Sequence, residues 1–69
     1  MIRQSVSSSN IVSIGYDSES QTLEVEFNSG GIYHYYNVSN GVHQTFINAG
    51  SHGKYFDQNI KNKYRYSKV

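Results

Sequence analysis

Alternation of apolar and charged residues is strongest in the segment 22–27, which reads Thr-Leu-Glu-Val-Glu-Phe. Its three apolar residues share one face and its two glutamates share the other, a pattern typical of a half-buried β-strand. The segments 10–16 and 32–38 are rich in β-branched and aromatic residues and have turn-forming residues beside them, so they also predict strands. The core face of the first strand is expected to carry Val12, Ile14 and Tyr16.

The turn at residues 28–31, Asn-Ser-Gly-Gly, decides where the tyrosines of the third strand point. A tight two-residue turn would place Tyr33 and Tyr35 on the glutamate face. A type I turn with Gly30 in a left-handed bulge position would instead pair both tyrosines with the apolar residues of 22–27. Serine is a poor first residue for a tight type I′ turn, so the bulged turn is favoured. A slip of one residue would reverse the two faces.

The bulged register also defines the outer face of the third strand. It places Ile32, His34 and Tyr36 there, with His34 opposite Glu24. A cross-strand pair of histidine and glutamate stabilises a sheet by ~0.2–1 kcal/mol, so His34 has a structural explanation.

Helical spacing of apolar residues begins after residue 38. Ser39 is expected to cap a first helix that ends at Gly50, and Ser51 a second one. The apolar stripes of the two helices are predicted to consist of Val42, Phe46 and Ile47, and of Tyr55, Phe56 and Ile60.

Residues 63–69, Lys-Tyr-Arg-Tyr-Ser-Lys-Val, are expected to form a fourth strand or an extended tail. Lys63 and Arg65 would then point to one side, and Tyr64 and Tyr66 to the other. The predicted fold class is α+β, with a three- or four-stranded antiparallel β-meander packed on one face by two short helices. Residues 1–69 are expected to form a single domain.

Charge is unevenly distributed along the chain, although the net charge of the 69 residues is only +1. Residues 1–53 carry one arginine against four acidic residues, whereas residues 54–69 carry five cations against Asp57 alone. A basic segment of this kind is either a solvated end of the chain or a footprint for a polyanion. The chain has no cysteine, and no segment resembles a signal peptide or a membrane span, which suggests a cytoplasmic protein.

Four separated segments, in this order and spacing, resemble the KTSC domain family. They are 7–17, 23–38 with its central Tyr33-x-Tyr35, 47–56 and 60–66. One departure is Ser39, since the family usually has proline there, and this changes only how the first helix begins. The family occurs at the C-terminus of some lysyl-tRNA synthetases and as stand-alone bacterial and phage proteins. The resemblance implies a cytoplasmic, non-catalytic module, and RNA binding is suggested by association with the synthetase alone.

Catalytic and metal-binding chemistry finds little support in the sequence. His34, His43 and His52 are nine residues apart each time and lie on different predicted elements, unlike the close pairs of metal motifs. No nucleophile elbow surrounds any serine, and the core signature of RNA-recognition motifs is absent. We therefore expect no enzyme, no catalytic residue, no metal and no cofactor.

The segment 48–55, Asn-Ala-Gly-Ser-His-Gly-Lys-Tyr, superficially resembles a phosphate-binding loop. It has asparagine where such a loop needs its first glycine, and tyrosine after the lysine, so it is not that motif. A weaker anion site at Ser51, His52 and Gly53 remains, at the start of the second helix. The structural alternative is Gly50 as a C-cap and Ser51 as an N-cap, and this alternative is favoured.

Two classes of function fit the sequence. The first is single-stranded nucleic-acid binding, preferably of RNA, in which cations follow the backbone and exposed rings stack on bases. Its candidate residues are Lys54, Lys61, Lys63, Arg65 and Lys68, with Tyr36 and Tyr66 as stacking rings. The alternative is a protein-interaction module: a homodimer, an accessory domain, or a phage protein that binds and inhibits a host factor. A scaffold with no ligand of its own is a third option, and a membrane partner is not expected.

Overall fold

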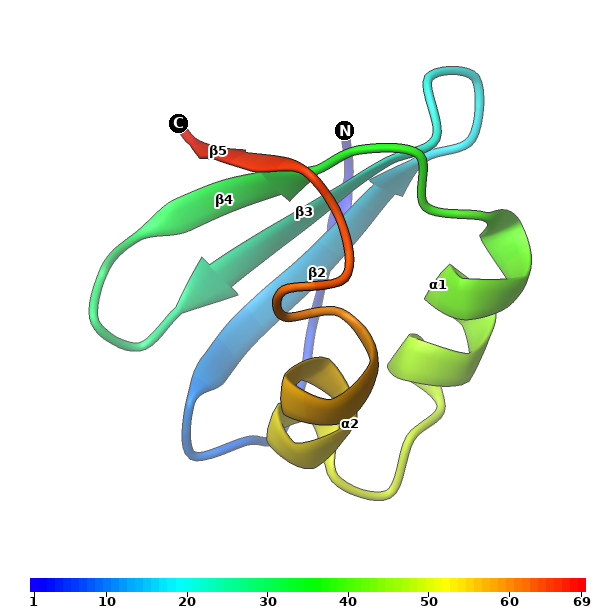
Figure 1. The fold of residues 1–69 in the computed structure, drawn as a ribbon. Helices are drawn as coiled ribbons and strands as arrows, with labels where there is room; N and C mark the ends of the chain where they lie inside the picture. Colours follow the sequence, from blue (N-terminus) through cyan, green and yellow to red (C-terminus); the bar gives the residue numbers. More distant parts are fainter.

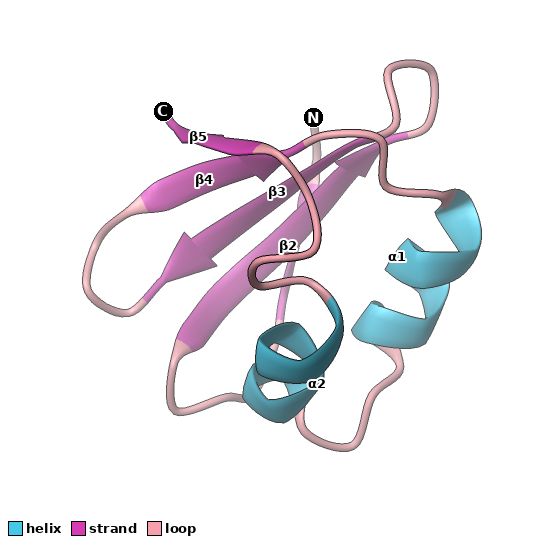
Figure 2. Cartoon of the chain, in the orientation of Figure 1, coloured by secondary structure: helices cyan, strands magenta, loops and turns pink.

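The strand and helix patterns assemble into a two-layer fold (Figures 1 and 2). The computed structural model describes all 69 residues. Its elements are β1 (Arg3–Ser5), β2 (Ile11–Asp17), β3 (Thr22–Phe27), β4 (Ile32–Tyr35), α1 (Asn40–Ile47), α2 (His52–Asn59) and β5 (Tyr66–Lys68). The strands form one antiparallel sheet in the order β1-β2-β3-β4-β5. Both helices lie on the same face of this sheet, and the chain then returns to add β5 beside β4.

The α+β class and the antiparallel meander under two helices are therefore confirmed. The sheet has five strands rather than three or four, because β1 also joins it. The pattern did not predict β1, whose three residues are polar and exposed. Neither helix has the length or apolar character needed to cross a bilayer.

The β3–β4 hairpin has the bulged register that the turn residues favoured. Gly30 has a φ of 98°, and its N–H donates to the Phe27 carbonyl at 2.9 Å. Val25 pairs with Tyr33 and Leu23 with Tyr35, so both tyrosines face the helices. On the other face His34 pairs with Glu24, as expected.

The expectation for β2 was wrong at Val12. A bulge between Ile11 and Ser13 inserts one residue into the strand, which shifts the alternation before it. As a result Ile11 and Ile14 are both buried in the core, whereas Val12 is exposed. The complete buried cluster consists of Ile11, Ile14, Leu23, Val25, Tyr35, Val38, Phe46, Phe56 and Ile60.

The two helices begin as expected. The Ser39 hydroxyl accepts from the Val42 N–H at 3.2 Å, and the Ser51 hydroxyl accepts from the Lys54 N–H at 3.3 Å. The end of the first helix was misplaced, because α1 stops at Ile47 and Asn48 is its C-cap. Gly50 lies beyond it and does not adopt a positive φ.

The chain end also differs in part from the expectation. A turn over residues 60–63 precedes β5, so Lys63 and Arg65 lie before the strand and their predicted alternation with Tyr64 does not apply. Tyr66 pairs with Tyr35, which places it on the helix-covered face.

Gly15 allows β1 to lie close to the sheet. A Cβ at this position would lie 2.9 Å from Arg3 Cγ and 3.1 Å from the Ile2 carbonyl oxygen. Arg3 crosses Gly15 and places its guanidinium between Glu24 and Glu26 of β3, at 3.2 Å from each. The absence of a side chain at Gly15 therefore permits the ion pairs that join β1 to β3.

We expect Gly15→Ala to destabilise the protein by about 1–3 kcal/mol, because the added methyl group overpacks this crossing. Urea unfolding measures the change. Gly50→Ala is the matched control, since a Cβ there meets no atom within 4 Å and the backbone has no positive φ. Equal stability of the two variants would show that the crossing does not require glycine.

Candidate functional site

Three tyrosines on β4 and β5 form a continuous aromatic surface on the inner face of the sheet. Tyr35 and Tyr66 are cross-strand partners with ring centroids 5.6 Å apart, and Tyr33 lies 6.0 Å from Tyr66. Exposure increases outwards, from 5% at Tyr35 through the half-buried Tyr33 to 58% at Tyr66. The hydrophobic core therefore opens onto the surface at this edge.

A pocket of about 290 Å³ lies over this surface, between the sheet and the end of α2. Its apolar floor and walls are formed by Phe27, Tyr33, Tyr35, Phe56 and Tyr66, and its polar lining is Ser29, Lys61 and Asn62. We call these eight residues the aromatic pocket. A second hollow of about 280 Å³ shares Phe27, Ser29, Phe56 and Lys61 with it and extends past Asp57 to Asn10 and Gly53. The two together form a groove along α2.

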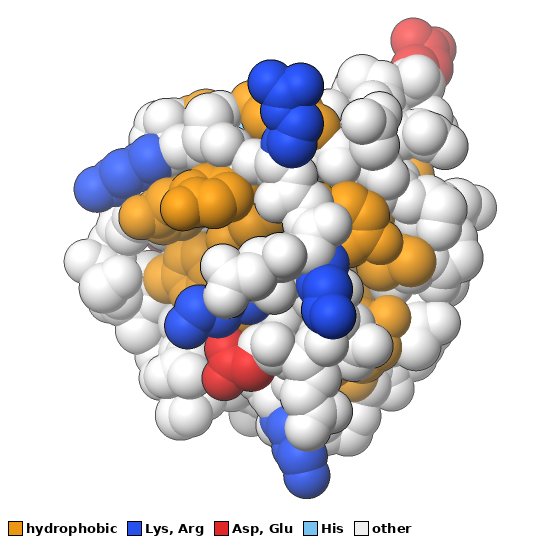
Figure 3. Space-filling model, in the orientation of Figure 1, with side chains coloured by type: hydrophobic (Ala, Val, Ile, Leu, Met, Phe, Trp, Pro, Cys, Tyr) orange, Lys and Arg blue, Asp and Glu red, His pale blue; other side chains and the backbone are white.

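Positive charge surrounds this groove. The five cations of the chain end, Lys54, Lys61, Lys63, Arg65 and Lys68, are all exposed, and none forms an ion pair. Figure 3 shows Lys and Arg side chains spread around an apolar patch on the face that carries α2 and β5, with few acidic side chains among them. Of the predicted residues, the structure brings Lys61 and Tyr66 together in the aromatic pocket.

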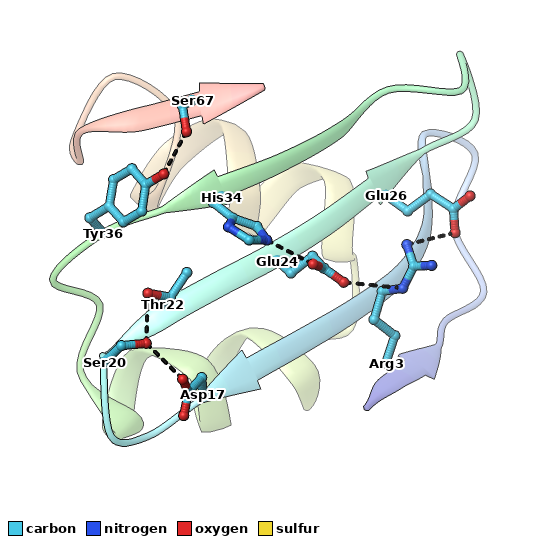
Figure 4. A network of polar contacts seen from close by, with 9 residues as sticks. All are labelled: Arg3, Asp17, Ser20, Thr22, Glu24, Glu26, His34, Tyr36 and Ser67. Atoms are coloured by element: carbon cyan, nitrogen blue, oxygen red, sulfur yellow. Dashed lines mark hydrogen bonds and ion pairs between the residues drawn. The ribbon is translucent and has the colours of Figure 1, made fainter. Parts of the chain in front are cut away.

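The opposite face of the sheet carries Glu24 and Glu26, and both are already paired (Figure 4), whereas the groove side keeps one unpaired carboxylate, Asp57, in the lining of the second hollow. Glu24 contacts Arg3 at 3.2 Å and His34 at 2.7 Å. Glu26 contacts Arg3 at 3.2 Å and accepts from the Ser13 hydroxyl at 3.1 Å. The two faces therefore differ in charge, and free cations gather only on the groove side.

Tyr36 lies on this acidic face, where its hydroxyl bonds to that of Ser67 (Figure 4). Tyr36 and Tyr66 were expected to serve one binding surface, but the structure does not bring them together. Tyr66 is the cross-strand partner of Tyr35, and Tyr36 is the residue after Tyr35, so the two rings point to opposite faces.

The predicted anion residues Ser51, His52 and Gly53 line a polar hollow of about 520 Å³ with Lys54 and with residues 7–10. Their polar groups have structural partners: Ser51 caps α2, and His52 Nε2 lies 3.1 Å from the Ile47 carbonyl oxygen. The capping role of Ser51 is confirmed, and anion binding here stays a prediction.

The three histidines lie apart on separate elements, and no group of three metal-ligating side chains occurs. His43 stacks on Tyr16 with ring centroids 4.6 Å apart, and burial lowers its pKa. The lining of the aromatic pocket contains no histidine and no carboxylate. What this lining offers a ligand is flat apolar surface, a cation and neutral polar groups.

Sequence reasoning missed six of the eight pocket residues. It assigned four aromatic side chains to the core, Phe27, Tyr33, Tyr35 and Phe56, it assigned Ser29 to the hairpin turn, and it did not consider Asn62. A partial signal was available for Phe27 and Tyr33, because both lie near the hairpin turn at the end of their strands. The position of Asn62 depends on the turn after α2, for which the pattern carried no signal.

The fold is that of a small α+β domain with a five-stranded sheet and two helices on one face. The sequence profile of the KTSC domain matches residues 7–64. The crystal structure of a KTSC domain protein from Yersinia pestis superimposes with a TM-score of 0.97 at 46% identity, and the match covers 99% of this chain and 96% of that one. The chain therefore belongs to the KTSC domain family.

Curated relatives occur in two settings. An uncharacterized protein from Stutzerimonas stutzeri is 44% identical over 70 residues, and the match covers all of this chain and 99% of that protein. A lysine–tRNA ligase from Trichormus variabilis is 43% identical over 54 residues, which is 78% of this chain but only 10% of the ligase. The fold thus exists both as a small protein and as a minor part of a much larger one.

Titration of Tyr35 should report how deeply the pocket floor is buried. Burial raises the pKa of Tyr35 to about 12, and the phenols of Tyr33 and Tyr66 act in the same direction. As pH rises above the ordinary value of 10.0, the unfolded chain loses this proton first, so stability falls between pH 10 and about 12. We expect Tyr35→Phe to reduce this alkaline loss of stability, measured by urea unfolding across that pH range.

Tyr36→Phe is the control, because it removes a phenol from the other face of the sheet. It should leave the alkaline loss of stability unchanged. If Tyr35→Phe and Tyr36→Phe behave alike, the floor of the pocket is not the origin of the effect.

Proposed function

We propose that this KTSC domain binds single-stranded RNA along the groove beside α2. The observation that carries the proposal is the aromatic pocket with Lys61 in its lining, on the face of the molecule where unpaired Lys and Arg side chains gather (Figure 3). Proteins that bind single strands combine a positive groove with aromatic rings on which bases stack. The domain has both features on the same side.

Tyr66 is the stacking residue in this proposal. More than half of its surface is exposed, and its ring packs beside those of Tyr33 and Tyr35, with centroids 6.0 and 5.6 Å away. Stacking of a base on an aromatic side chain contributes about 1–3 kcal/mol, and it tolerates any base because each has a flat π-face. A supported ring is well suited to this role, because little side-chain freedom remains to be lost on binding.

The cations supply the contacts with phosphate. Lys61 lines the pocket itself, and the other four lie elsewhere on residues 54–68. Because none has a carboxylate partner, binding a phosphate breaks no existing ion pair. Glu24 and Glu26 lie on the far face and are held by Arg3, so they do not oppose a polyanion at the groove. Asp57 is the one carboxylate in the groove lining, and the five cations of residues 54–69 outnumber it.

One group of relatives gives the proposal a biological context. Some relatives are lysine–tRNA ligases, enzymes whose name refers to an RNA substrate. A small module attached to such an enzyme could add contacts with RNA, in the cytoplasm and without catalysis. The argument for binding still depends on the groove, because attachment alone does not define a function.

The triple variant Lys61→Ala, Lys63→Ala and Arg65→Ala should weaken binding of mixed-sequence single-stranded RNA and make it less sensitive to salt. Each phosphate contact contributes about 0.7 to the slope of log affinity against log salt for single strands, so the slope should fall by about 2. Fluorescence anisotropy of a labelled oligonucleotide, repeated over a salt series, measures both quantities.

All three side chains are exposed and unpaired, so the variant should remain folded, which circular dichroism checks. Tyr36→Ala is a second control, because it removes a surface ring from the face away from the groove. Unchanged RNA affinity in the triple variant would reject the proposal. A stable dimer that ignores RNA, seen by light scattering, would favour the protein-interaction alternative.

A further inference from the structure

We propose that the aromatic pocket holds one nucleobase, preferably adenine, and that Asn62 recognises the edge of this base. The inference rests on the proposed function and deepens it, because it adds sequence preference to RNA binding. Its basis is the juxtaposition of an apolar floor with three polar residues on the same hollow, Ser29, Lys61 and Asn62.

The pocket has the size of a site for one flat ring system. Its volume of about 290 Å³ lies at the lower limit of small-ligand pockets, which begin near 300 Å³. Five aromatic side chains line it, and one of them, Tyr66, is itself largely exposed to solvent. A base can therefore enter from the side while its sugar and phosphate stay outside with the cations.

Asn62 is placed by a well-anchored turn. Ile60 is fully buried, the Lys61 N–H donates to the Phe56 carbonyl at 2.8 Å, and the Lys63 N–H donates to the Ile60 carbonyl at 3.0 Å. Between them Asn62 adopts a left-handed conformation with φ of 64°. The backbone position of Asn62 relative to the pocket is therefore defined before any ligand binds.

The amide of Asn62 has no hydrogen-bond partner within the protein, and glycine would suit a left-handed backbone at least as well. A primary amide offers a donor and an acceptor side by side, which match the N6 amino group and N7 of adenine. Lys61 next to it is a point charge, which suits a phosphate.

The test uses labelled uridine oligomers of one length that carry a single central adenosine, guanosine or cytidine, or none. Fluorescence anisotropy at fixed salt gives the affinity of the intact protein for each. We expect the adenosine oligomer to bind at least about fivefold more tightly than the all-uridine oligomer, the low end of what a bidentate base contact gives. Asn62→Gly should bring the affinity ratio between the adenosine oligomer and the all-uridine oligomer down to about one.

Asn37→Gly is the matched control. Asn37 also has a left-handed backbone, with φ of 60°, and it does not line the pocket, so this variant should keep the adenosine preference. Equal affinity of the wild-type protein for all four oligomers would overturn the inference and leave the proposed function standing. A preference that persists in Asn62→Gly would reject Asn62 as the recognising residue. No binding to any oligomer would reject both proposals.

Discussion

The register of the β3–β4 hairpin is the constraint on which the rest of the structure depends. Gly30 takes the left-handed position of the turn, and the Phe27 N–H donates to the Gly31 carbonyl at 2.9 Å. The Asn28 N–H donates to the Asn10 carbonyl at 2.8 Å, so the turn is also tied to the start of β2. A slip of one residue would move Tyr33 and Tyr35 to the outer face and leave the groove without its floor.

Because of this register, the two faces of the sheet differ in character: the outer face is polar and the inner face is apolar. The outer face is a closed polar network in which Arg3, His34 and Ser13 satisfy both glutamates. The inner face is apolar, and the helices cover it incompletely at the edge where β5 joins β4. Polar groups with partners gain little from a ligand, whereas exposed rings and unpaired cations can gain contacts. Binding is therefore proposed at the groove.

Local patterns predicted the elements that depend on local chemistry. The alternation in β3, the favoured turn and the two serine caps all come from residues close together in the chain, and each was confirmed. The bulge between Ile11 and Ser13 escaped prediction because Val12, Ile14 and Tyr16 alternate without interruption, so the sequence gives no sign of an extra residue there. The strand β1 escaped because its three residues are polar, and its contacts are the pairing with β2 and the ion pairs of Arg3 with β3, all distant in the chain. The basic end of the chain was visible in the sequence, but the pocket was not, since its lining joins β3, β4, α2 and β5.

The central claim is that ligand binding occurs on the groove side of the sheet. Titration of the isotopically labelled protein with single-stranded RNA, followed through its backbone amide chemical shifts, tests this claim most directly. We predict progressive shift changes at Tyr33, Lys61, Asn62 and Tyr66, with little change at Glu24, His34 and Tyr36. Changes confined to the outer face, or none at saturating RNA, would contradict it.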